Sequence, residues 1–186
     1  MTRESLARAL GGRPFRFFTS LDSTNSEARR WLAAVAAGDR RPGAERATPQ
    51  SGTVIVADEQ TAGRGRFSRG WLTPTGSAVA MSVLLRNPAP SKVAVAAGLA
   101  VSDAVSPLVE EPVWLKWPND VELGARKVAG ILSESIHACG AQWTIVGIGI
   151  NVDVDFAGGE GEVLQEEGVD APAEELSVKA TSLSAY

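Results

Sequence analysis

The chain has 186 residues, of which 44% are hydrophobic and 22% charged, so it can form one domain with a buried core and is not disordered throughout. A formal net charge of -4 argues against DNA binding by phosphate neutralisation, and the longest near-unbroken apolar run, residues 93–101, is too short to cross a bilayer. One cysteine and one histidine exclude a disulfide framework and a Cys/His zinc site. Because Arg8 interrupts the first apolar stretch, no export signal is visible and a cytoplasmic protein is expected.

The first half of the chain predicts short helices and strands in alternation. Residues 4–10 are expected to form a helical turn, and residues 15–18 a strand. A helix is expected over residues 28–37, after the capping-box spacing of residues 24–27. The β-branched run at residues 53–58 predicts a strand that is buried on both faces.

The second half predicts a helix at residues 91–105 and strands at residues 78–85, 113–116, 121–123, 128–135 and 143–152. Gly124-Ala125 and Cys139-Gly140 are expected to be turns, so that the last strands form hairpins. Together these elements predict an α+β fold, a mixed and largely antiparallel sheet with helices packed on one face. Residues 158–175 are rich in glycine and acidic side chains and are expected to form a flexible, solvated loop.

Residues 59–71 carry the clearest chemical signal. Alternating glycines allow the backbone to turn its N–H groups inward around an anion. Arg64, Arg66 and Arg69 add fork-shaped donors that suit phosphate or carboxylate. The segment fits neither the Walker loop nor the dinucleotide-binding glycine motif. We therefore expect an anion-binding loop at the end of a buried strand, rather than an ordinary solvated loop.

Three further segments place polar groups at the ends of elements. Asn119 and Asp120 suit a turn at a strand end. Lys127 opens an apolar strand, where it either reaches solvent or binds a ligand. The polar residues within 21–25 either cap the following helix or belong to a binding site. The glycines within residues 147–151 permit close approach of a ligand or of another backbone.

Five motifs follow one another along nearly the whole chain. They are Ser23-Thr24-Asn25, Gln60-Thr61-Ala62-Gly63-Arg64-Gly65-Arg66, Lys116-Trp117-Pro118-Asn119-Asp120, Lys127-Val128-Ala129-Gly130-Ile131-Leu132 and Gly147-Ile148-Gly149-Ile150-Asn151. In this order they resemble the biotin protein ligases, in the short class that lacks an N-terminal DNA-binding domain. The resemblance implies a catalytic fold like that of class II aminoacyl-tRNA synthetases, shared by the biotin and lipoate ligases. Residues 1–186 would form the catalytic domain, and the family's small C-terminal SH3-like domain is expected to be absent.

The resemblance also implies a reaction and its residues. The family makes biotinyl-5′-AMP from biotin and ATP with Mg²⁺, and then transfers biotin to one lysine of the biotin carboxyl carrier domain of acyl-CoA carboxylases. The implied catalytic residues are Lys127, Arg64, Arg66 and Asp120. The implied biotin-binding residues are Ser23, Thr24, Asn25, Gln60, Arg64, Gly65, Arg66, Lys127 and Gly130. The implied ATP- or adenylate-binding residues are Arg66, Arg69, Trp71, Asn119, Lys127, Asn151 and Ala180, and no metal ligand is assigned.

Two other functions stay open from the sequence. A lipoate ligase or octanoyltransferase shares the catalytic fold and also acts on carrier domains. The other alternative is a non-catalytic module that binds biotin or an adenylate. The Gly-Arg-Gly-Arg loop followed by Trp71, together with residues 116–120, favours biotin. Neither specific DNA binding nor membrane association is expected, and the sequence does not indicate an oligomeric state.

Overall fold

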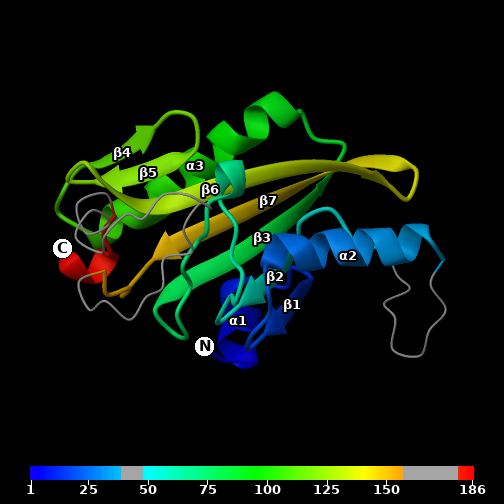
Figure 1. The fold of residues 1–186 in the computed structure, drawn as a ribbon, viewed down its shortest axis with the longest axis horizontal. Coiled ribbons are helices and arrows are strands. Elements are labelled where there is room, and N and C mark those ends of the chain that lie inside the picture. Colours follow the sequence, from blue (N-terminus) through cyan, green and yellow to red (C-terminus); the bar gives the residue numbers. More distant parts are fainter. Residues whose placement is uncertain (39–47, 157–179) are drawn as a thin grey trace.

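A single sheet forms the centre of the protein. The computed structural model describes residues 1–38, 48–156 and 180–186. Seven strands form the sheet, and helices lie around it (Figure 1). The predicted acidic loop at residues 158–175 lies outside the described residues. In the part of the chain that is described, no helix is both long and apolar enough to cross a membrane.

The elements predicted for the first half are present. They are α1 (Arg3–Ala9), β1 (Phe15–Phe18), α2 (Thr24–Ala36) and β2 (Thr53–Ala57). All of β2 is buried, as its unbroken apolar run predicted. A short 3-10 turn, η1 (Arg66–Ser68), lies within the glycine- and arginine-rich loop.

The second half forms the larger part of the sheet. Its elements are β3 (Ala78–Arg86), α3 (Pro90–Val105), η2 (Ser106–Leu108), β4 (Val113–Lys116), β5 (Asp120–Leu123), β6 (Arg126–Ala138), β7 (Ala141–Asn151) and η3 (Leu183–Ala185). Both predicted turns are confirmed: φ is 52° and 62° at Gly124 and Ala125, and 52° and 69° at Cys139 and Gly140. Two-residue turns with positive φ match the twist of the strands they join. They therefore close the β5–β6 and β6–β7 hairpins.

The strand order is β1-β2-β3-β7-β6-β5-β4. β1 and β2 run parallel, and every other pair of neighbours in this sheet is antiparallel. The predicted mixed, largely antiparallel sheet is therefore confirmed. β3, β7 and β6 lie at its centre, so both of their faces can be covered.

The two long helices cover opposite faces of the sheet, and the prediction that helices pack on one face is wrong. On β7, Trp143 and Ile145 pack with Trp31 of α2. Val146 and Ile148 instead belong to a second cluster, which contains the buried valines of α3. Successive residues of a strand point to opposite faces, so α2 and α3 lie on opposite sides, as Figure 1 shows. The apolar run of β7 hardly alternates, which is typical of a strand buried on both faces.

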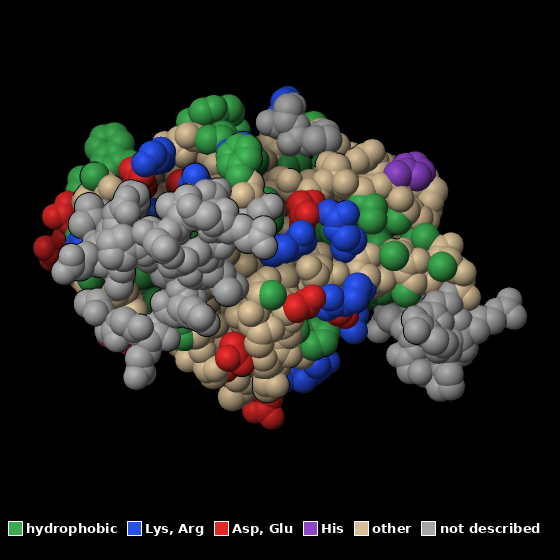
Figure 2. Space-filling view, in the orientation of Figure 1, with side chains coloured by type: hydrophobic (Ala, Val, Ile, Leu, Met, Phe, Trp, Pro, Cys, Tyr) green, Lys and Arg blue, Asp and Glu red, His purple; other side chains and the backbone are tan. Residues whose placement is uncertain are grey.

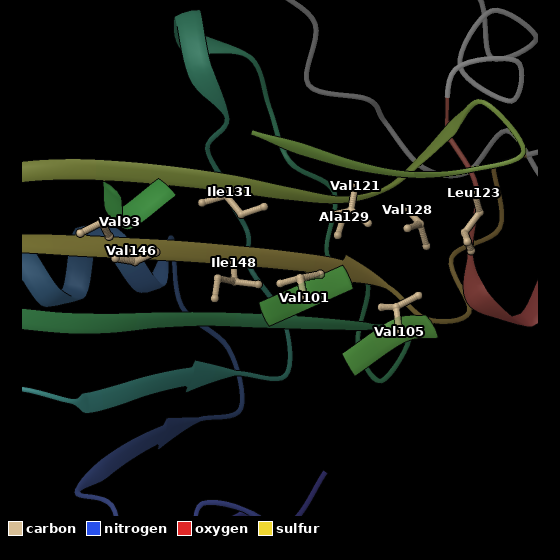
Figure 3. Close-up of a cluster of buried hydrophobic side chains, with 10 residues drawn as sticks. All are labelled: Val93, Val101, Val105, Val121, Leu123, Val128, Ala129, Ile131, Val146 and Ile148. Carbon is tan, nitrogen blue, oxygen red and sulfur yellow. The ribbon is translucent and has the colours of Figure 1, made fainter. Parts of the chain in front are cut away.

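The α3 side of the sheet contains a cluster of buried apolar side chains (Figure 3). Its buried members come from α3, β5, β6 and β7: Val93, Val101, Val105, Val121, Leu123, Val128, Ala129, Ile131, Val146 and Ile148. The buried polar residues of the described chain include Thr24, Asn25 and Ser82, which meet on the α2 side.

Trp143→Ala is expected to lower the free energy of unfolding by about 3–5 kcal/mol, because it empties a buried site between β7 and α2. Trp114→Ala is the matched control, since the Trp114 side chain is 64% exposed on β4. The control should change the free energy by no more than about 0.5 kcal/mol. Urea unfolding measures both values, and equal losses would contradict a buried layer between α2 and the sheet.

Candidate functional site

A cleft lies on the α2 side of the sheet, between the N-terminus of α2, the loop that follows β2, and strands β6 and β7. The space between its walls, counted out to the open solvent, is about 440 Å³. The lining residues are Ser23, Thr24, Asn25, Gln60, Arg64, Gly65, Arg66, Trp71, Met81, Asn119, Lys127, Gly130, Ile131, Leu132, Gly147, Ile148 and Gly149. Basic and acidic side chains lie close together on this face (Figure 2).

Interlocked hydroxyls and amides form one end of the cleft. Gln60 Oε1 accepts hydrogen bonds from Thr24 N at 2.8 Å and from Thr24 Oγ1 at 3.2 Å, while Gln60 Nε2 donates to Thr73 Oγ1 at 3.2 Å. The buried Ser82 Oγ on β3 donates to Asn25 Oδ1 at 2.6 Å and lies 2.7 Å from Thr24 Oγ1. This network fixes the orientation of the polar groups that face the cleft.

The start of α2 is held by Asp22 rather than by the predicted capping box. Ser23 is the N-cap, but its side chain makes no capping hydrogen bond, and Thr24 bonds across the cleft instead. Asp22 Oδ1 accepts from Ser23 N at 2.7 Å, and its carboxylate accepts from both terminal nitrogens of Arg30 at 2.6 and 2.8 Å. The hydrogen bonds from Arg30 hold the pKa of Asp22 below its ordinary value of 3.8.

The floor of the cleft consists of residues with little or no side chain. Gly149 of β7 pairs with Gly130 of β6, which pairs in turn with Asp120 of β5. Paired residues of antiparallel strands project to the same face. A Cβ atom on Gly149 would lie 2.3 Å from Trp71 Cε2, and one on Gly130 would lie 2.9 Å from Trp71 Cζ3. A close approach is therefore present at Gly149 of β7, but the group that approaches is an indole ring and not the ligand or backbone that the sequence predicted.

Lys127 reaches this floor through an irregularity in the sheet. It is an odd number of residues from Gly130, so in a regular strand the two would face opposite sides. A register shift between β5 and β6 changes this, and a Gly130 Cβ would lie 3.1 Å from Lys127 Nζ. Lys127 Nζ pairs with Asp120 Oδ1 at 2.8 Å and lies 5.2 Å from the Trp71 ring centroid.

Arg66 joins the same polar group from the glycine-rich loop. Its NH1 donates to Asn119 Oδ1 at 2.9 Å, and Asn119 Nδ2 donates to Asp120 Oδ1 at 3.0 Å. Arg66, Asn119, Asp120 and Lys127 therefore form a continuous chain of polar contacts. Two cations and an amide at one end of a cleft suit a carboxylate or phosphate ligand.

A second cleft adjoins the first and shares Arg66, Trp71 and Lys127 with it. It is lined by Gly65, Arg66, Phe67, Arg69, Gly70, Trp71, Leu72, Asn119, Asp120, Lys127, Asn151, Phe156 and Ala180. Asn151 Nδ2 donates to Thr181 O at 3.1 Å, and Thr181 N donates to Lys127 O at 2.9 Å. Asn151 thus holds the Ala180 segment beside β6. In the described ranges, no group of three or more His, Cys, Asp or Glu side chains could hold a metal ion.

The fifteen site residues expected from the sequence all line one of these two clefts. Sequence reasoning missed Ser82 and Glu134. Ser82 is the one hydroxyl in the apolar run of β3, and Glu134 lies four residues after Gly130, on the same face of β6. Both residues stand out by their positions in the sequence. The sequence does not show, however, which side chains they contact.

Comparison with known proteins identifies the family. The model of the biotin/lipoate A/B protein ligase family matches residues 43–153, which is more than half of the chain. The chain belongs to this family. The expected fold of the biotin and lipoate ligases is confirmed by its structural relatives.

Two solved members of the biotin/lipoate ligase family and one curated member give the degree of similarity. The biotin protein ligase of Aquifex aeolicus, in complex with biotin and ATP, has a TM-score of 0.65 at 32% identity, over 92% of this chain and 60% of that chain. The Leishmania major enzyme with biotinyl-5-AMP has a TM-score of 0.64 at 25% identity, over 92% and 64%. The biotin–[acetyl-CoA-carboxylase] ligase of Mycobacterium tuberculosis is 41% identical over 54% of this chain and 40% of its own length. The chain thus spans less than two thirds of these relatives.

Asp22→Asn is expected to remove part of the pH dependence of stability. Because the folded-state pKa of Asp22 is lowered, its ionised form stabilises the fold above about pH 3.8, and this contribution is lost as the pH falls through the lowered pKa. The variant should be less stable than the parent at about pH 7, by less than about 1 kcal/mol because the side chain is 42% exposed. The urea midpoints of the variant and the parent should converge as the pH falls through the lowered pKa of Asp22.

Asp103→Asn, an exposed change on α3, is the control and should leave the midpoint unchanged at both pH values. A difference between Asp22→Asn and the parent that is the same at neutral and acid pH would contradict the role of the Asp22 charge.

Proposed function

We propose that this protein activates biotin with ATP to form biotinyl-5′-AMP and transfers biotin to a lysine of a biotin carboxyl carrier domain. The main support is the cleft itself. A polar end at Gln60 and Thr24 and a cationic end at Lys127 and Arg66 lie on either side of a glycine floor. Biotin has the same sequence of parts, with a polar ureido group, an apolar ring system and a carboxylate tail.

The polar end suits the ureido group because its donors and acceptors are already oriented. Ser23 and Thr24 lie at the start of α2, where backbone N–H groups and hydroxyls meet the carbonyl of Gln60. Preorganised groups bind more tightly because they lose little freedom on binding. Asn25 is bonded on both sides by protein groups, so its role in our proposal is to position its neighbours.

The first step needs charge neutralisation more than acid–base chemistry. The biotin carboxylate oxygen attacks the α-phosphorus of ATP, a new O–P bond forms, and the bond to pyrophosphate breaks. Lys127 and Arg66 stand at the cationic end and offset the negative charge that grows on the phosphoryl oxygens. Trp71 lines both clefts, so its ring separates the biotin and nucleotide sites in our proposal.

The second step forms an amide. The amine of the acceptor lysine attacks the acyl carbon, the C–O bond to AMP breaks, and the amine loses a proton. Asp120 is the carboxylate next to Lys127, and we assign it the role of receiving that proton. Arg69, Asn119, Asn151 and Ala180 line the second cleft and would contact the nucleotide.

Mg²⁺ belongs to the proposal as the companion of ATP. In nucleotide sites the ion takes one or two carboxylates and otherwise phosphate oxygens and water. Asp120 lines the second cleft and could supply one oxygen, although it also pairs with Lys127. The ion would neutralise phosphate charge when bound.

The direct test is to incubate the protein with ATP, Mg²⁺, a carrier domain and either biotin or lipoate, and then to weigh the carrier. A carrier that gains one biotinyl group supports the proposal. A gain of a lipoyl group only would establish the lipoate ligase alternative. Binding of biotin without any carrier modification would establish a non-catalytic binding module.

Lys127→Ala is expected to slow pyrophosphate release by about 10²–10³-fold, the loss typical of one transition-state donor. The physical reason is that Lys127 neutralises charge at the reacting phosphoryl group. Lys92→Ala, an exposed change on α3, should keep the parent rate. Parent-like pyrophosphate release by a folded Lys127→Ala variant would overturn the assignment of Lys127.

Arg66→Gly is expected to weaken retention of the adenylate more than its synthesis. Charge-assisted hydrogen bonds to the phosphate slow its release, and this change removes their donor. Free biotinyl-5′-AMP reacts with any lysine, so biotin should appear on bystander proteins. A biotin blot of bystander protein with ATP measures this, and labelling no greater than the parent's would show that Arg66 does not retain the intermediate.

A further inference from the structure

Glu134 lies at the outer edge of the first cleft and connects three parts of the protein. It projects from β6, and its side chain is 18% exposed. Its Oε1 accepts from Arg29 NH2 at 2.7 Å, and its Oε2 accepts from Asn25 Nδ2 at 2.8 Å and from Arg64 NH2 at 3.1 Å. The first two partners belong to α2, whereas Arg64 belongs to the glycine-rich loop.

The α2 contacts make Glu134 a fixed point. Asn25 is 3% exposed, and its Oδ1 is bonded to Ser82 of the central strand β3. Arg29 neutralises the carboxylate independently of the loop. Glu134 therefore keeps its position and its charge balance whether or not Arg64 is bound to it.

Arg64 is the more exposed partner. Its side chain is 43% exposed, while the backbone on either side of it is held: Trp71 N donates to Gly63 O at 2.9 Å, and Gly65 N donates to Arg69 O at 2.7 Å. A guanidinium carries five N–H donors, and the contact with Glu134 uses the NH2 nitrogen. Since Arg64 also lines the first cleft, its other donors can bind an anion there while NH2 stays on Glu134.

We propose that Glu134 is a positioning residue that acts through Arg64, by holding its guanidinium over the cleft where the carboxylate tail or phosphate of the ligand binds. The inference rests on the proposed function for the identity of that ligand. It gives Arg64 a defined orientation in the structure, because a charge-assisted contact to a fixed carboxylate restricts the arginine to a few orientations. Arg64 then has less freedom to lose when the ligand arrives.

The contact also couples the two ends of the cleft. A line of polar contacts runs from Gln60 through Thr24, Ser82 and Asn25 to Glu134, and from there to Arg64. The groups assigned to the ureido end and the loop assigned to the tail therefore share one network. Networks of this kind stabilise more than their separate pairs.

The test variant is Glu134→Gln, which keeps the shape of the side chain and removes its charge. Glu27→Gln is a matched control, because Glu27 is 16% exposed and pairs with two arginines, Arg16 and Arg30. Glu27 lines neither cleft. If the two variants lose a similar amount of stability, a difference in loop cleavage between them is not caused by a difference in stability.

The first measurement needs no ligand. Trypsin cleavage after Arg66 and Arg69 reports how often the loop leaves the protein surface. Glu134→Gln should raise that cleavage rate by about 3- to 10-fold, the size expected for losing one partly exposed charge-assisted hydrogen bond. Glu27→Gln should not. Equal cleavage rates in Glu134→Gln and the parent would overturn the inference, whatever the reaction of the protein proves to be.

The second measurement is the dissociation rate of biotinyl-5′-AMP. Glu134→Gln should raise this rate by a similar factor of about 3 to 10, with little change in the rate of pyrophosphate release at saturating biotin. Arg64→Gln should raise it as well, and adding Glu134→Gln to that variant should have no further effect. Additive effects would show that Glu134 does not act through Arg64. If the parent protein binds no adenylate, the proposed function fails. The trypsin result would still decide whether the contact between Glu134 and Arg64 holds the loop in place.

Discussion

The site depends on the absence of side chains at the centre of the sheet. α2 covers one end of β7 and β6 through Trp31 and the buried Trp143. Toward the other end the same face carries Gly130, Gly147 and Gly149. Asn25 of α2 lies against Gly147, whereas Trp71 of the loop, and not a helix, lies against Gly130 and Gly149. A cleft forms there because the sheet continues while its apolar cover ends. The Trp71 ring lies directly on the glycines and divides the space into two adjoining clefts.

The electrostatics of the cleft follow from the same arrangement. Each of its main cations has a polar partner on the sheet or at its edge: Asp120 for Lys127, Asn119 for Arg66 and Glu134 for Arg64. Carboxylates within hydrogen-bond distance hold Lys127 and Arg64, and the neutral amide of Asn119 holds Arg66. The cations are therefore held in defined positions both on the sheet and in the loop.

The opposite face serves a different purpose. A cluster of buried apolar side chains lies between α3 and strands β5, β6 and β7 (Figure 3). It keeps the central strands in register, so that Asp120, Gly130 and Gly149 stay aligned across three strands. A shift of one residue would turn the Asp120 side chain to the other face and bring residues with side chains to the positions of the glycines. Packing on the α3 side thus determines the geometry on the α2 side.

The sequence by itself determined the local elements and a set of fifteen residues that all line the two clefts. These features depend on residues that are close together in the chain, so the sequence is enough to predict them. They include the turn residues with positive φ, the β-branched run of β2 and the ordered motifs. Only the tertiary structure decided that α2 and α3 lie on opposite faces, that Thr24 bonds to Gln60 instead of capping its helix, and that a register shift turns Lys127 toward Gly130. The partners of Ser82 and Glu134 were decided in the same way. The physical reason is that strand pairing brings together residues far apart in the chain, and a one-residue irregularity in that pairing reverses the face on which a side chain lies.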